Sequence, residues 1–174
     1  RQLKEIMDAR YEKLNNIIEK CDTEDEKDLW NKLYYAANKG RRTGLGTHGL
    51  ADAISRMCLA YDSEDAIRLA DQIYSTIRNE AYSESVELAK ERGAFPGFDW
   101  NKENNNLFIK SLPDYLQDEI SRYGRRNISI LTNAPTGSVS IMSQTSSGLE
   151  PVFRNSYTRR RKNDHGDSDT KVDF

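Results

Sequence analysis

The stretch of sequence best suited to chemistry is residues 134–140, which reads APTGSVS. It carries hydroxyl groups at positions 136, 138 and 140, a flexible Gly137, and consecutive backbone N–H groups at the expected start of a helix. Hydroxyls and free N–H groups bind phosphate oxygens. The P-loop pattern is absent because no lysine follows Gly137. The residue types alone leave two interpretations open, an anion-binding loop and an ordinary turn.

A second glycine-rich segment, residues 44–49 with the sequence GLGTHG, matches the pattern GxGxxG. In a dinucleotide-binding fold this pattern follows a buried strand, so that the N-terminus of the next helix meets the pyrophosphate. Residues 34–42, which precede it here, have a charged and helical pattern instead. We therefore interpret the glycines as a place where two helices pack with their backbones close together.

The histidines and cysteines do not form a metal-binding pattern. Cys21 and Cys58 are far apart without CxxC spacing, and His48 and His165 have no recognised ligand spacing to them or to each other. We predict no metal site and no disulfide framework, which suits a reducing cytoplasm.

A basic run at residues 159–162 lies near Tyr157 and Phe153 and has the composition of a nucleic-acid contact. A solvated charged surface is the favoured interpretation, because 26 basic and 28 acidic residues give a net charge of only -2. No apolar run approaches the roughly 18 residues of a membrane span. We expect a cytoplasmic protein with no membrane partner, and nucleic acid is not an expected partner.

The elements that position these residues are mostly helices. Apolar residues at three-and-four spacing predict helices over residues 2–21, 24–40, 50–57, 63–93 and 113–123. Asp22-Thr23 is the expected N-cap of the second helix and Gly93 the expected C-cap of the fourth. The loop over residues 95–106 is expected to be pinned to the surface by its aromatic side chains. Residues 1–123 are thus predicted to be helix-rich.

A strand is predicted over residues 127–132, where β-branched and apolar residues lead into the 134–140 segment. Residues 171–174 resemble the start of another strand that has nothing to pair with, and residues 163–170 are expected to form an exposed connection. Residue 1 is not a methionine and the opening reads as mid-helix, so we expect a fragment of a longer protein. Helices followed by a strand and a turn favour the α/β class.

Three blocks together resemble the large, catalytic subunit of ribonucleotide reductases. They are RRTGLGTHGLADA at residues 41–53, ELAKERGAFPGF at 87–98 and ISILTNAPTGSVSIMSQTSSGLEPVF at 128–153. The resemblance covers most of residues 36–165. The APTGS form of the loop, SSGLEPVF and the later YTRRRK resemble the class II enzymes, which depend on adenosylcobalamin.

This resemblance implies a ten-stranded α/β barrel, with residues 1–153 forming a partial catalytic barrel segment and residues 154–174 a basic and polar connecting segment. It also implies a loop that holds the substrate's diphosphate, formed by Ala134, Pro135, Thr136, Gly137, Ser138 and Val139. The implied reaction is the reduction of ribonucleotides by thiyl radical chemistry. The implied cofactor is adenosylcobalamin, and the implied partners are a ribonucleoside diphosphate, the remainder of the catalytic subunit, a thioredoxin-like reductant and a second copy in a homodimer.

The cysteines that perform this chemistry in the family have no counterpart here. Neither Cys21 nor Cys58 lies in the family's Asn-x-Cys-x-Glu motif, and the family's C-terminal cysteine pair is absent. We therefore predict no catalytic residue in this chain, which is expected to be inactive alone. The alternative is a separately encoded assembly module of a split reductase.

Overall fold

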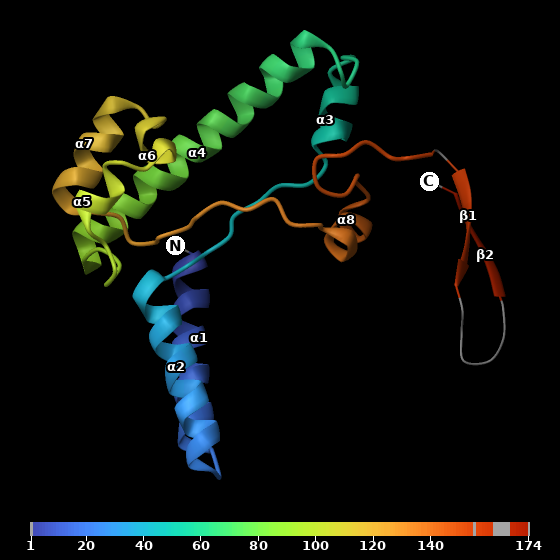
Figure 1. The fold of residues 1–174 in the computed structure, drawn as a ribbon. Helices are drawn as coiled ribbons and strands as arrows, with labels where there is room; N and C mark the ends of the chain where they lie inside the picture. The colour runs from blue at the N-terminus through green and yellow to red at the C-terminus, as the bar shows by residue number, and fades with distance from the viewer. Residues whose placement is uncertain (1, 155, 162–167, 174) are drawn as a thin grey trace. The chain divides into compact units, whose positions relative to one another are not determined.

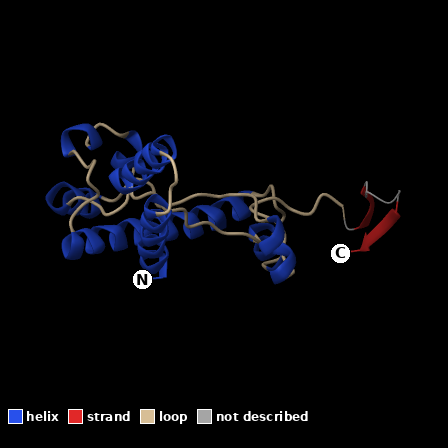
Figure 2. Cartoon of the chain, turned by 90° about the horizontal axis from the view of Figure 1, so that it is seen from below, coloured by secondary structure: helices blue, strands red, loops and turns tan. Residues whose placement is uncertain are grey.

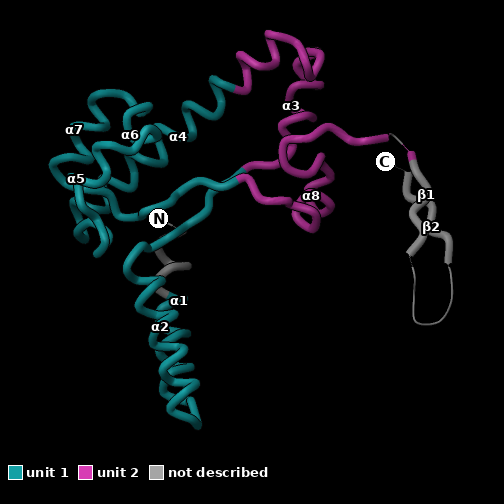
Figure 3. Tube along the Cα trace, in the orientation of Figure 1, with its two compact units in different colours: residues 1–46, 71–132 teal, residues 47–70, 133–174 magenta. Residues whose placement is uncertain are grey.

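The computed structural model describes residues 2–154, 156–161 and 168–173. Helices account for most of the described chain (Figure 1, Figure 2). The chain divides into two compact units, coloured separately in Figure 3. Unit 1 comprises Arg1–Gly46 and Asp71–Thr132, and unit 2 comprises Thr47–Ala70 and Asn133–Phe174. No described helix is both long enough and apolar enough to cross a membrane.

Unit 1 begins with a helical hairpin of α1 (Gln2–Glu19) and α2 (Glu24–Gly40). The predicted N-cap is confirmed, since the Thr23 hydroxyl accepts the Glu26 N–H at 3.3 Å. Tyr11 joins the two helices, because its hydroxyl donates to the Ala37 carbonyl at 3.1 Å and its ring meets Tyr34 edge-on. None of the α2 residues is fully buried, so the hairpin contributes little to the core.

The core of unit 1 forms where α4 (Glu64–Arg92), α6 (Leu107–Lys110) and α7 (Asp114–Tyr123) pack together. The division between the units falls within α4, whose residues from Asp71 onward belong to unit 1. The buried cluster contains Tyr82, Val86, Ile109, Leu112, Leu116, Ile120 and Ile130. Gly93 has a φ of 81°, as a C-capping glycine requires, so the predicted end of α4 is confirmed.

The connection before α6 is less irregular than predicted. Within the expected loop, α5 (Trp100–Glu103) begins where the Asp99 side chain accepts the Asn101 N–H at 3.0 Å. Asn106 caps α6 in the same way through the Phe108 N–H. These one-turn helices are too short to show an apolar period. The pinning role of the aromatics is confirmed by Phe95, which is buried.

The predicted strand at residues 127–132 is only partly formed. Residues 43–45 and 129–132, here called the extended pair, run parallel and share one isolated bridge, between Leu45 and Leu131. Three backbone hydrogen bonds join them: Thr43 N–H to Ser129 O, Leu45 N–H to Ile130 O, and Thr132 N–H to Leu45 O. The pairing does not continue beyond this bridge, so neither segment is a regular strand.

The glycine-rich segment behaves as a packing site. A Cβ added at Gly44 would lie 2.5 Å from Cγ2 of Thr132, so only glycine permits this approach of the extended pair. The segment follows α2 rather than a buried strand. The expected close approach is therefore confirmed, but it joins two extended segments rather than two helices. The dinucleotide-binding arrangement is not present in this part of the structure.

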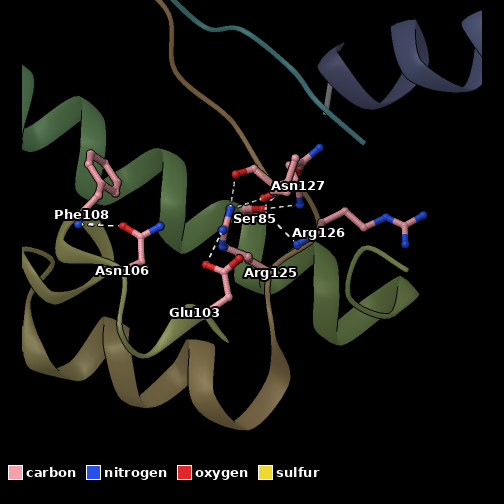
Figure 4. A network of polar contacts seen from close by, with 8 residues as sticks. Ser85, Glu103, Asn106, Phe108, Arg125, Arg126 and Asn127 are labelled. Atoms are coloured by element: carbon pink, nitrogen blue, oxygen red, sulfur yellow. Dashed lines mark hydrogen bonds and ion pairs between the residues drawn. The ribbon is translucent and has the colours of Figure 1, made fainter. Parts of the chain in front are cut away.

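A buried polar network holds the backbone that leads into residues 129–132 of the extended pair (Figure 4). Arg125 is 2% exposed, and its guanidinium donates to the carbonyl oxygens of Asn127 and Ile128 and pairs with Glu103 at 2.7 Å. The Ser85 hydroxyl donates to Asn127 Oδ1 and accepts the Arg126 and Asn127 N–H groups. This network ties α4 and α5 to the backbone that enters the extended pair.

Unit 2 contains α3 (Leu50–Arg56), α8 (Gly137–Ser143) and a hairpin of β1 (Ser156–Arg161) and β2 (Ser168–Asp173). The strands are antiparallel, with Ser156 opposite Asp173. The expectation that the last strand has no partner is therefore wrong, because β1 pairs with it. The consecutive arginines of β1 break the polar and apolar alternation that reveals a strand in a sequence. Residues 162–167, which include Lys162 and His165, lie outside the described residues.

Candidate anion-binding loop

Residues 134–139, here called the anion loop, lead from the extended backbone into the first turn of α8. Thr136 precedes the helix and makes no side-chain capping bond. Within the described chain, no acceptor takes the backbone N–H of Gly137, Ser138 or Val139. The first N–H groups of a helix have no partner inside it. All three residues are exposed, so these donors are open to a ligand from solvent.

The three hydroxyl groups of the segment have different roles. Ser138 is exposed and makes no side-chain hydrogen bond among the described residues. The Thr136 hydroxyl accepts the Gly148 N–H at 3.0 Å, which leaves its own hydrogen free to donate. Ser140 is 5% exposed and donates to the Gly137 carbonyl at 3.0 Å, so it is part of the helix rather than of a surface site.

Gly137 keeps the approach to the loop open. A Cβ added there would meet no atom within 4 Å, and its φ is not in the left-handed region. The glycine thus serves to leave space rather than to allow an unusual conformation. Ala134 and Pro135 are exposed residues that lead into the loop, and Val139 is 53% exposed on the first turn of α8.

The anion loop is supported by residues 144–148, here called the return segment. Gln144, with a φ of 55°, ends α8 and turns the chain back. Sequence reasoning missed the side chains that hold this segment. Asp52 Oδ2 accepts the Ser146 N–H at 2.6 Å, and His48 Nδ1 lies 2.9 Å from the Thr145 hydroxyl. Both residues lie in the same GTHGLAD stretch, but a contact between positions about ninety apart leaves no local pattern in a sequence.

The remaining candidate residues are not assembled into a reactive centre. Both cysteines are free, and no group of metal ligands occurs among the residues that the structure describes. Desolvation raises the pKa of the Cys21 thiol, whose sulfur donates to the Ile17 carbonyl at 3.2 Å. A raised pKa reduces the thiolate fraction, and the thiolate is the nucleophilic form. Side chains of the basic run at 159–162 lie outside the described residues.

Unit 1 also contains a groove of about 420 Å³ between α4 and the extended pair. The exposed surface of the groove is mainly apolar, but its lining also includes the charged residues Glu80, Glu84, Arg92 and Arg126. A groove of this size suits a drug-sized molecule at most. It does not fit a corrinoid, which is larger than this space.

Comparison with known proteins identifies the family. Residues 1–171 match the family described as "Ribonucleotide reductase, barrel domain", and the chain belongs to this family. It is 38% identical over 128 residues to a vitamin B12-dependent ribonucleoside-diphosphate reductase of Mycobacterium tuberculosis, covering 74% of this chain and 16% of that protein.

Two further relatives show the range of the family. A vitamin B12-dependent ribonucleoside-diphosphate reductase of Thermoplasma acidophilum is 33% identical over 68% of this chain and 14% of its own length. The ribonucleoside-diphosphate reductase subunit alpha of Treponema pallidum is 26% identical over 93% of this chain and 19% of its own length. The chain therefore spans less than a fifth of the length of these relatives, and their printed names do not all specify vitamin B12.

Proposed function

We propose that this chain is a segment of a class II ribonucleotide reductase catalytic subunit and that it holds the diphosphate of the substrate. The observation that carries the proposal is the set of open N–H groups at Gly137, Ser138 and Val139, beside the free Ser138 hydroxyl. They occur in the loop that resembles the family's diphosphate-binding segment. Because α8 has only seven residues, we expect these N–H donors to contribute more to phosphate binding than the dipole of the helix does.

Holding the diphosphate matters because it places the ribose. In a complete subunit, the binding energy of the phosphates is converted into orientation of the ribose against the radical cysteine. This chain supplies donors that neutralise and fix phosphate oxygens, while the thiyl radical and the reducing cysteines come from elsewhere in the subunit. We assign no catalytic residue to the chain and expect it to be inactive alone.

The class II assignment is supported by the printed names of the relatives from M. tuberculosis and T. acidophilum. Adenosylcobalamin would supply the radical in the complete enzyme. The groove in unit 1 does not fit that cofactor, so no described residue is assigned to it and no step is derived through it.

The ten-stranded α/β barrel is supported by the extended pair, because its parallel segments are joined through helices as in a parallel α/β fold. We expect residues 1–153 to belong to the barrel and residues 154–174 to form a connection. The proposed partners are a ribonucleoside diphosphate, the rest of the catalytic subunit, a thioredoxin-like reductant and a second copy in a homodimer, all in the cytoplasm.

The test is the double variant Thr136→Ala with Ser138→Ala in the complete catalytic subunit. Hydrogen bonds to charged groups contribute about 1.5–3 kcal/mol each, so we expect KM for the ribonucleoside diphosphate to rise about tenfold or more, with a smaller change in kcat. Ser121→Ala is the matched control, since Ser121 is exposed on α7 and donates only to the Asp118 carbonyl. Unchanged KM in the double variant would refute the assignment.

A further inference from the structure

The return segment contacts both α8 and the anion loop. In α8, the Ser140 carbonyl accepts the Thr145 N–H at 3.0 Å. In the anion loop, the Thr136 hydroxyl accepts the Gly148 N–H at 3.0 Å. A displacement of the return segment therefore changes the position of Thr136, whose carbonyl also receives the Ser140 N–H at 2.8 Å. The orientation of the open N–H groups depends on this segment.

The start of α3 in turn holds the return segment. The peptide groups around Ser146 are bound from two sides, since Asp52 Oδ2 accepts the Ser146 N–H at 2.6 Å and the Gly49 N–H donates to the Ser146 carbonyl at 3.0 Å. Ser146 is 7% exposed. A hydrogen bond from a buried N–H to a carboxylate is about twice as strong as one between neutral groups.

The backbone at Gly49 permits this arrangement. The φ of Gly49 is 76°, a backbone conformation that residues with a side chain rarely adopt. A Cβ added there would lie 3.3 Å from Cβ of Thr145. Glycine thus lets the turn before α3 approach the return segment closely enough for Asp52, in the first turn of the helix, to reach the Ser146 N–H.

We propose that Asp52 is a positioning residue of the anion loop: its carboxylate fixes the return segment, which keeps the Thr136 hydroxyl and the open N–H groups in the geometry that binds a diphosphate. Among the described residues, Asp52 makes no hydrogen bond or ion pair with the anion loop itself, so it acts through Ser146 and Gly148. The inference rests on the proposed function of the loop. Its consequence is that loss of Asp52 weakens binding of the diphosphate rather than the chemical step.

The experiment uses the complete catalytic subunit and measures KM and kcat for the ribonucleoside diphosphate together with the inhibition constant of inorganic pyrophosphate. Asp52→Ala leaves the buried Ser146 N–H without an acceptor, and we expect KM and the inhibition constant to rise by similar factors, about tenfold, with kcat nearly retained. Asp52→Asn keeps an acceptor oxygen without the charge, so its values should lie between wild type and alanine. Asp62→Ala is the control, because Asp62 is exposed and lies just beyond α3.

Wild-type KM and pyrophosphate inhibition in both Asp52 variants would overturn the proposal, as would a fall in kcat at unchanged KM. If Asp52→Ala does not fold, Asp52→Asn decides alone: raised KM and weakened pyrophosphate inhibition support the proposal, and wild-type values contradict it. The Ser138→Ala substitution combined with Thr136→Ala separates the two levels. Unchanged KM in this double variant refutes the loop assignment itself, whereas an effect there with none at Asp52 refutes only the positioning role.

Discussion

In unit 1, apolar side chains of α4, α6 and α7 are buried against one another, whereas in unit 2 the anion loop is exposed and is held by hydrogen bonds to the return segment. Ile120 has no exposed surface, while Ile141 and Met142 on α8 are 72% and 86% exposed. Apolar packing and a buried ion-pair network therefore hold the first region, whereas hydrogen bonds to the return segment hold the anion loop. Substitutions in the first should change stability, and substitutions in the second should change binding.

The largest effect is expected from Arg125→Ala. Removing one partner of a buried ion pair leaves the other charge unpaired and costs about 3–5 kcal/mol. Arg125 also donates to two backbone carbonyls and lies over the Tyr82 and Phe95 rings, so the loss extends beyond Glu103. The loss in the free energy of unfolding can be measured by urea unfolding monitored by tryptophan fluorescence, since Trp100 packs against this core. A change below 1 kcal/mol would show that the network does not stabilise unit 1.

Ile120→Ala should have a slightly smaller effect. Truncating a fully buried isoleucine costs about 2–5 kcal/mol through lost burial and the cavity that remains. Ile141→Ala is the matched substitution in unit 2 and should change the free energy of unfolding by no more than about 0.5 kcal/mol. If both substitutions lowered the free energy of unfolding equally, apolar packing would not distinguish the core of unit 1 from α8.

The smallest expected effect concerns the helical hairpin. Thr23→Ala removes the N-cap of α2, which costs about 1 kcal/mol, whereas Thr23→Ser keeps the hydroxyl and should restore most of it. Circular dichroism during thermal unfolding measures both variants. Identical transitions for alanine and wild type would mean that the hydrogen bond from Glu26 N–H is not maintained in solution.

Features with a local cause could be predicted from the sequence. Thr23 and Gly93 marked a helix start and end, and Gly44 marked a close approach. Each depends on the chemistry of one residue and its immediate neighbours. The sequence also located the segment that becomes the anion loop, although its residue types alone could not distinguish an anion site from a turn.

Features that depend on distant partners could not be predicted. The support of the return segment by Asp52 joins residues 94 positions apart. Similarly, β2 pairs with β1, and β1 could not be recognised as a strand because its consecutive arginines show no alternation of polar and apolar residues. The isolated bridge at Leu131 likewise depends on Leu45, which lies 86 positions earlier in the chain.

The most direct test of the central claim compares a ribonucleoside diphosphate with the unphosphorylated nucleoside as ligands of the complete catalytic subunit. Gly137→Pro removes one open N–H at a helix position that tolerates proline, and Gly137→Ala keeps that N–H as the control. The account predicts that proline weakens diphosphate binding severalfold and leaves nucleoside binding unchanged, while alanine has a smaller effect. Equal weakening of both ligands, or none for the diphosphate, would contradict it.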